Sequence, residues 1–142
     1  MESMKLSTLI SEEQIATRVR EMGAALTDRF KGKDLIAVGA LKGSFMFYAD
    51  LIRQIDTDMI CEFCGASSYG GTQSSGEVKM TMDIGRSVRD RHVVLIEDIV
   101  DTGLTMNYLR EHLLARKPKS LTTVALLLKP DALKVKCPLD MV

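Results

Sequence analysis

Three acidic side chains lie within five positions of one another in this 142-residue chain. Glu97, Asp98 and Asp101 follow a run of β-branched and aliphatic residues, and Thr-Gly-Leu-Thr comes directly after them. The apolar run predicts a buried strand, and apolar residues spaced i, i+3 and i+7 from position 106 predict a helix. Main-chain N–H groups and hydroxyls at a helix N-terminus favour an anion, while the acids can bind sugar hydroxyls or a divalent metal. The pattern is therefore suited to a phosphorylated sugar.

Two other interpretations of the same segment stay open at this level. Asp101 or Thr102 could be only the N-cap of the helix, with Glu97 and Asp98 solvated at the end of the strand. Asp-Thr-Gly is also the signature of aspartic proteases, in which two such loops share one proton. That fold requires a strand after the loop, whereas residues 107–116 have the pattern of a helix. The protease interpretation is therefore disfavoured.

The rest of the chain alternates predicted helices and strands, which indicates an α/β fold with a mostly parallel central sheet flanked by helices. A first helix begins after the capping-box spacing of Ser11 and Gln14, and a second has Phe45, Ala49 and Ile52 on one side. The predicted strands cover residues 35–41, 59–63, 78–82, 93–100 and 122–128, the third as a hairpin return. Because there is no repeat and no linker, residues 1–142 are expected to form a single domain.

Loops that carry polar groups follow three of the predicted parallel strands. Lys42 and Gly43 follow the first, residues 101–105 follow the central one, and Lys129 follows the last. In open parallel sheets the ligand lies beyond the carboxyl ends of the strands, so these groups are expected to form one site. The Ser- and Gly-rich residues 66–77 cannot bury themselves and are expected to form a mobile loop over that site.

Composition and charge exclude several classes of function. The chain is 46% hydrophobic and 27% charged, with zero formal net charge, so no general attraction to nucleic acid or membrane is expected. No signal peptide or membrane-length apolar run is present, which favours a cytoplasmic protein. Cys61 and Cys64 have CxxC spacing inside a strand-like run, where their side chains point to opposite faces. We therefore expect buried structural cysteines, and no redox or zinc site.

The acidic segment resembles the phosphoribosyl diphosphate (PRPP) binding motif of type I phosphoribosyltransferases. In this motif four apolar residues precede Glu-Asp, two more follow, and Asp-Thr-Gly-x-Thr ends it; every position is filled here. Three further segments resemble the hypoxanthine-guanine branch of that family. They are its pyrophosphate loop at 41–45 (Leu-Lys-Gly-Ser-Phe), its mobile loop at 67–70 (Ser-Ser-Tyr-Gly) and its purine-binding segment at 127–130 (Leu-Leu-Lys-Pro). The resemblance covers about residues 8–142 and implies the type I phosphoribosyltransferase fold.

The resemblance implies an enzyme of purine salvage. Such an enzyme uses Mg²⁺ and transfers the 5-phosphoribosyl group of PRPP to hypoxanthine or guanine, giving IMP or GMP and pyrophosphate. A xanthine-preferring relative, another type I transferase and a PRPP-binding regulatory protein remain alternatives. Regulators of the last kind usually carry a basic face for nucleic acid, which zero net charge disfavours. Family members are commonly homodimers or homotetramers.

The resemblance also assigns roles around the sugar and its phosphates. Glu97 and Asp98 are expected to hold the ribose hydroxyls and the metal. Lys42 and Gly43 are expected to bind pyrophosphate, with a cis bond between Leu41 and Lys42. The 5-phosphate is expected to lie against one loop, made of Asp101, Thr102, Gly103, Leu104 and Thr105.

The remaining implied roles concern the purine and the loop above it. Asp101 is expected to act as general acid or base beside a purine ring nitrogen. Lys129 is expected to donate to the 6-oxo group of the base, although a lysine at a strand end can also simply extend its ammonium into water. Ser68 and Tyr69 are expected to belong to a lid. Family members continue past Val142, so the C-terminal part of the domain is expected to be missing here.

Overall fold

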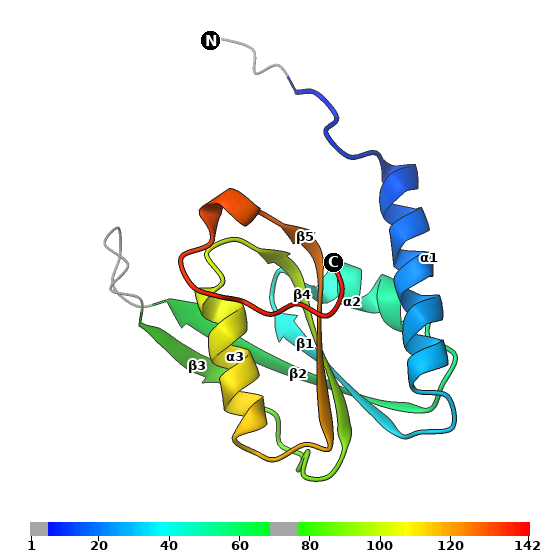
Figure 1. Cartoon of the computed structure of the whole chain (residues 1–142), viewed down its shortest axis with the longest axis vertical. Helices are drawn as coiled ribbons and strands as arrows, with labels where there is room; N and C mark the ends of the chain where they lie inside the picture. Colours follow the sequence, from blue (N-terminus) through cyan, green and yellow to red (C-terminus); the bar gives the residue numbers. More distant parts are fainter. Residues whose placement is uncertain (1–5, 69–76) are drawn as a thin grey trace.

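Five strands form a single sheet in the order β3-β2-β1-β4-β5 (Figure 1). The computed structural model describes residues 6–68 and 77–142. Neighbouring strands pair in parallel except β2 and β3, which are antiparallel. The elements in chain order are α1 (Glu12–Arg29), β1 (Leu35–Leu41), α2 (Phe45–Ile52), β2 (Met59–Ser68), β3 (Val78–Met82), β4 (His92–Val100), α3 (Leu104–Leu114), β5 (Ser120–Leu128) and the short 3-10 helix η1 (Pro130–Ala132). The predicted α/β fold, its mostly parallel sheet and the hairpin return of β3 are confirmed.

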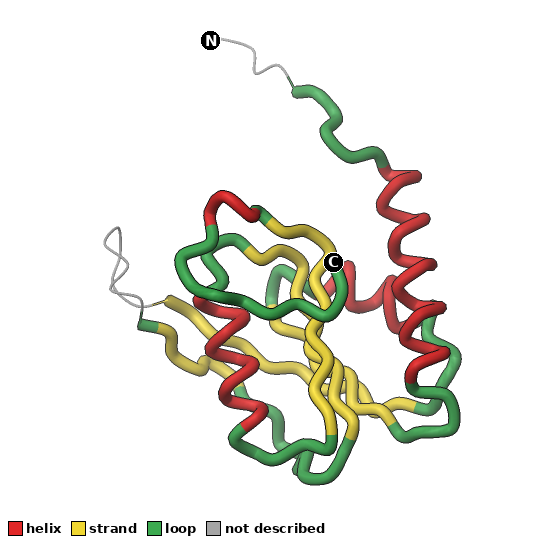
Figure 2. Tube along the Cα trace, in the orientation of Figure 1, coloured by secondary structure: helices red, strands yellow, loops and turns green. Residues whose placement is uncertain are grey.

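Helices cover both faces of the sheet (Figures 1 and 2). Successive strand side chains point to opposite faces. Leu35 and Val94 therefore pack with α1 and α2, whereas Ile36 and Val93 pack with α3. Because β1 and β4 are buried on both sides, their sequences are nearly continuous apolar runs.

The first helix begins where its sequence predicts. The Ser11 hydroxyl accepts a hydrogen bond from the Gln14 main-chain N–H at 3.1 Å, and the Gln14 side chain accepts one from the Ser11 N–H at 2.8 Å. This reciprocal capping box satisfies two N–H groups that the helix itself leaves unpaired.

The apolar side predicted for α2, with Phe45, Ala49 and Ile52, is only partly its buried side, since Ile52 packs against the core but Phe45 does not. Phe45 is 57% exposed, and the buried residues are Phe47, Tyr48 and Leu51. The helix reads Phe-Met-Phe-Tyr-Ala-Asp-Leu-Ile, so apolar residues occur all round it and their spacing does not define one face. Tertiary contacts decide its rotation: the Tyr48 hydroxyl donates to the main-chain carbonyl of Ala37 at 2.8 Å.

The two cysteines of the CxxC spacing point to opposite faces of β2, as predicted, but only one is buried. Cys64 lies in the core under α3, where burial, with smaller contributions from the negative charges of Glu97 and Asp83, raises the pKa of its thiol to about 12. Cys61 is exposed, contrary to the expectation that both are buried. All three cysteines, including Cys137, are free thiols.

The last residues of the chain run back across the sheet after η1 (Figure 1). Met141 forms an isolated parallel bridge with Val124 of β5. Among residues 6–68 and 77–142, no helix is long and apolar enough to cross a membrane.

Candidate functional site

The acidic segment forms the carboxyl end of β4 and the turn into α3. Gly103 is the N-cap residue of α3 and has a φ of 84°, a left-handed conformation that glycine adopts at little cost. The hydroxyl of Thr102 accepts a hydrogen bond from the Leu104 N–H at 3.3 Å. Neither Asp101 nor Thr102 is the N-cap residue, so the interpretation of either as a simple helix cap is wrong. The helix that follows also excludes the aspartic-protease arrangement.

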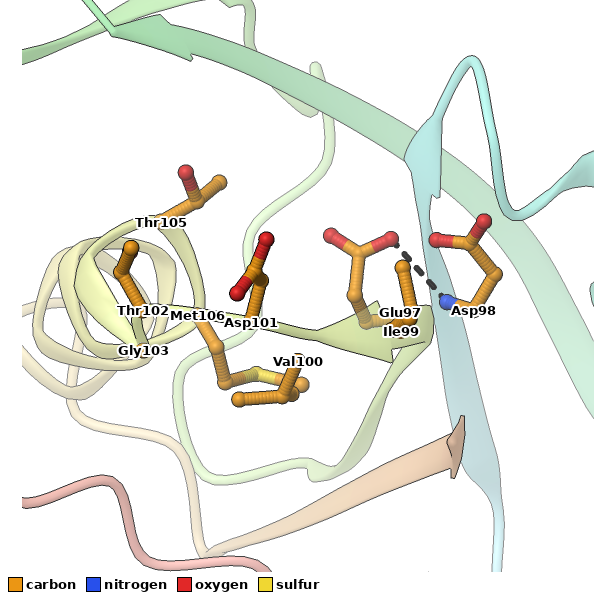
Figure 3. Close-up of a pocket in the computed structure, with 9 residues that line it drawn as sticks. All are labelled: Glu97, Asp98, Ile99, Val100, Asp101, Thr102, Gly103, Thr105 and Met106. Carbon is orange, nitrogen blue, oxygen red and sulfur yellow. Dashed lines mark hydrogen bonds between the residues drawn. The ribbon is translucent and has the colours of Figure 1, made fainter. Parts of the chain in front are cut away.

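A cavity of about 180 Å³ lies against this turn. Figure 3 shows that the carboxylates of Glu97 and Asp101 and the hydroxyl of Thr105 point to the same side. The lining residues that the sequence singled out are Glu97, Asp98, Asp101, Thr102, Gly103 and Thr105, whereas Leu104 does not line the cavity. Sequence reasoning missed the apolar members of the lining, Ile99, Val100 and Met106, because their spacing also suits an ordinary core.

Glu97 has the most perturbed acidity in the site. Burial is the largest cause, and the adjacent Asp98, through a hydrogen bond and its negative charge, raises the pKa of Glu97 further, to about 8. The Asp98 N–H donates to Glu97 Oε1 at 3.0 Å, which opposes this shift without cancelling it. The carboxyl groups of Glu97 and Asp98 thus lie close together in a partly buried site. A bound cation or hydroxyl donors would stabilise their ionised forms there.

The loop between β1 and α2 reaches the same acids. Gly39 of β1 is the register partner of Ile96 of β4, so the ends of these strands lie side by side. A Cβ built on Gly43 would lie only 2.9 Å from Asp98 Oδ2, so the glycine main chain is in close contact with this carboxylate. The peptide bond between Leu41 and Lys42 is cis, as expected.

The lysine after β5 approaches the loop from the other side. The ammonium nitrogen of Lys129 lies 3.9 Å from Asp101 Oδ2. The two side chains are 59% and 56% exposed, so this ion pair is weak. The structure therefore brings together the three predicted strand-end segments that contain Gly43, Asp101 and Lys129.

The predicted lid falls at the edge of the described residues and stays a prediction. Ser68 is the last residue of β2, and Tyr69 lies outside the described residues. Within residues 6–68 and 77–142, no group of three or more His, Cys, Asp or Glu side chains is arranged to hold a metal ion.

Phosphoribosyltransferases resemble this chain in both sequence and fold. A family model described as "Phosphoribosyl transferase domain" matches residues 7–141. The chain is 46% identical over 129 residues to a hypoxanthine-guanine phosphoribosyltransferase of Staphylococcus epidermidis, covering 90% of this chain and 72% of that protein. A Staphylococcus aureus hypoxanthine-guanine phosphoribosyltransferase is 47% identical over 127 residues, covering 89% and 71%. A crystal structure of a hypoxanthine phosphoribosyltransferase from Staphylococcus aureus aligns with a TM-score of 0.90 and 44% identity, over 96% of this chain and 74% of that one.

Proposed function

The chain belongs to the phosphoribosyl transferase family, and we propose that it transfers the 5-phosphoribosyl group of PRPP to hypoxanthine or guanine. The products are IMP or GMP and pyrophosphate, a reaction of purine salvage. The observation that carries this proposal is the cavity at the end of β4, where carboxylates, threonine hydroxyls and a left-handed glycine meet at the start of α3.

The turn into α3 is the proposed site of the 5-phosphate. Main-chain N–H groups at a helix N-terminus favour an anion, and the hydroxyls of Thr102 and Thr105 are further hydrogen-bond donors. Gly103 has no side chain, so an oxygen can approach its main chain closely. Leu104 is proposed to contribute its N–H alone, which must then exchange its 3.3 Å hydrogen bond with the Thr102 hydroxyl for one with the phosphate. Lys42 and Gly43, on the neighbouring loop, are proposed to bind the pyrophosphate.

Asp101 is proposed as the general acid or base for a purine ring nitrogen. Its carboxylate points to the open side of the loop (Figure 3). Positive charge develops on the sugar carbon as pyrophosphate leaves, so a carboxylate beside the reacting base can both hold a proton and stabilise that charge.

Lys129 is proposed to select 6-oxopurines. A lysine ammonium only donates hydrogen bonds, so it can pair with the 6-oxo group of hypoxanthine or guanine. It has no acceptor for the 6-amino group of adenine. Its position 3.9 Å from Asp101 supports placing the base between the loops after β4 and β5.

Mg²⁺ is the proposed cofactor. It usually binds through one or two carboxylates together with substrate phosphates and waters, and seldom in an all-protein cage. Glu97 and Asp98 fit this requirement, since the raised pKa of Glu97 reflects two acids that a cation would stabilise in their ionised form. When bound, the ion would neutralise charge on the pyrophosphate. The two acids would also hold the ribose hydroxyls.

We propose that Ser68 and Tyr69 belong to a lid over the site. We also propose that the protein acts in the cytoplasm, because its three free thiols fit a reducing compartment.

The protein is further proposed to form homodimers or homotetramers. Phe45 and Met46, exposed side by side at the start of α2, support an interface between copies. The mass in solution, measured by light scattering, tests the oligomer.

One assay tests the activity. Pyrophosphate release is measured with PRPP and each of hypoxanthine, guanine, xanthine and adenine, with and without Mg²⁺. We expect release with hypoxanthine or guanine in the presence of Mg²⁺, and none with adenine. Release with xanthine alone would replace the proposed substrate, and PRPP binding without release with any base would indicate a regulatory protein.

A further inference from the structure

The main chain on both sides of Asp101 is held by the segment that follows β5. The Val100 carbonyl accepts a hydrogen bond from the Lys129 N–H at 2.9 Å, and the Thr102 carbonyl accepts one from the Lys134 N–H at 2.8 Å. The carbonyl groups of the two residues that flank Asp101 are therefore both held by residues 129–134.

These hydrogen bonds determine where the N–H groups of the loop point. In a trans peptide the C=O and the following N–H point in opposite directions, and the bond between Thr102 and Gly103 is trans. Because the Thr102 carbonyl is held by Lys134, the Gly103 N–H must point away from the C-terminal segment. No acceptor for this N–H is found in the part of the chain that the structure describes, so it can donate to a bound anion.

The same segment also packs against Gly103. A Cβ built on Gly103 would lie 3.0 Å from Cys137 Cβ, 3.2 Å from Leu133 Cδ2 and 3.4 Å from Val135 Cγ2. In Figure 3 the red trace of the C-terminal segment lies on the opposite side of the turn from the Asp101 carboxylate and the Thr105 hydroxyl. The turn thus has one face toward the cavity and one face against residues 133–137.

We propose that residues 133–137, here called the brace, position the phosphate-binding turn, with the Lys134 N–H as the deciding group. This inference rests on the proposed function of the turn. Main-chain N–H groups that already point toward the site bind an anion more tightly, because binding then has no entropy cost for ordering them. The brace supplies that order by holding the Thr102 carbonyl and filling the space beside Gly103.

The test removes one hydrogen-bond donor and puts a carbon in its place. The Cδ of proline would stand where the Lys134 amide hydrogen now points at the Thr102 oxygen, 2.8 Å from the nitrogen, so the Thr102 carbonyl must also move away. Proline has no N–H, and Leu133 already has φ −61° and ψ 128°, a conformation compatible with a following proline. Lys134→Pro therefore deletes the N–H, whereas Lys134→Ala keeps it and removes the same side chain. Calorimetric titrations of both variants with ribose 5-phosphate and with pyrophosphate report separately on the turn and on the loop of Lys42.

We expect Lys134→Pro to bind ribose 5-phosphate about tenfold or more weakly than Lys134→Ala, the loss typical of a misdirected hydrogen bond to a charged group. Pyrophosphate affinity should differ less than about twofold between them, because that ligand does not depend on the turn. Equal ribose 5-phosphate affinity in the two variants would overturn the proposal. So would an equal loss for both ligands, which would indicate general disorder.

A second pair of variants serves if Lys134→Pro does not fold, as judged by its thermal unfolding. Val135→Ala removes methyl groups beside Gly103 and so changes the brace. Leu139→Ala is its control, because Leu139 lies just beyond the brace and packs on the α3 side of the sheet. Only Val135→Ala should weaken ribose 5-phosphate binding, and equal effects would overturn the brace. If the unaltered chain bound no ribose 5-phosphate while remaining folded, the proposed function itself would be overturned.

Discussion

At the scale of single residues, Asp101 lies where two roles meet. It belongs to the turn proposed to hold the phosphate, and its carboxylate is 3.9 Å from the ammonium group of Lys129. Because this carboxylate is more than half exposed, replacing it costs little folding energy, and its substitution reports on chemistry.

The substitution Asp101→Asn should lower turnover about 10²- to 10⁴-fold, the range typical of a lost general acid or base. The KM for PRPP should change much less, since the main-chain donors of the turn remain. Steady-state kinetics in both directions check this expectation. Unchanged turnover in the variant would remove Asp101 from the chemistry.

Gly43 gives a second prediction at this scale. A methyl group there would meet Asp98 Oδ2 at 2.9 Å, and the carboxylate must then move. Gly43→Ala should raise the Mg²⁺ concentration needed for half-maximal activity severalfold, because metal sites tolerate little displacement of a ligand. Gly85→Ala is the matched control, since nothing lies within 4 Å of the Cβ it adds. Identical Mg²⁺ dependence in the two variants would contradict the prediction.

At the scale of elements, the junction between β4 and α3 depends on a glycine with positive φ. Gly103→Ala introduces left-handed strain of about 1–2 kcal/mol and an overpacked contact with Cys137 that typically costs about 1–3 kcal/mol. Gly32 has a similar φ of 73° with nothing within 4 Å, so Gly32→Ala introduces the strain alone.

Urea unfolding should therefore show a larger loss of stability for Gly103→Ala than for Gly32→Ala, and the difference measures the packing of the C-terminal segment on the turn. Equal losses would mean that this packing contributes nothing to stability.

At the scale of the whole molecule, Glu97 couples the site to stability. Its pKa is raised from 4.5 to about 8 in the folded chain, so the folded state holds an extra proton between these values. Without Mg²⁺, this group should lower the free energy of unfolding as pH rises from about 4.5 to 8, by at most about 1.4 kcal/mol per pH unit.

Glu97→Gln removes this contribution. Its unfolding free energy, measured in urea with a chelator at pH 5, 6.5 and 8, should exceed that of the unaltered chain by an amount that grows with pH. Curves that stay parallel across this range would show that Glu97 titrates normally.

The sequence by itself determined the order of helices and strands, the parallel sheet and the acidic turn. These depend on local signals: the alternating or continuous apolar runs of the strands, the capping box of Ser11 and the fixed spacing from Glu97 to Thr105. The same signals predicted that Gly43 and Lys129 would meet this turn, because parallel strands end at one edge. Such patterns are properties of neighbouring residues, and each is readable without the fold.

Tertiary structure alone decided which side of α2 is buried, since apolar residues surround that helix and its rotation follows from the packing of Phe47, Tyr48 and Leu51 in the core and the hydrogen bond from Tyr48 to β1. It also raised the pKa of Glu97, which depends on burial that no local pattern reports. The hydrogen bond from Lys134 to Thr102 joins residues 32 positions apart. Contacts of this kind form only when the chain has packed. Their partners are distant in sequence, and no sequence pattern links one partner to the other.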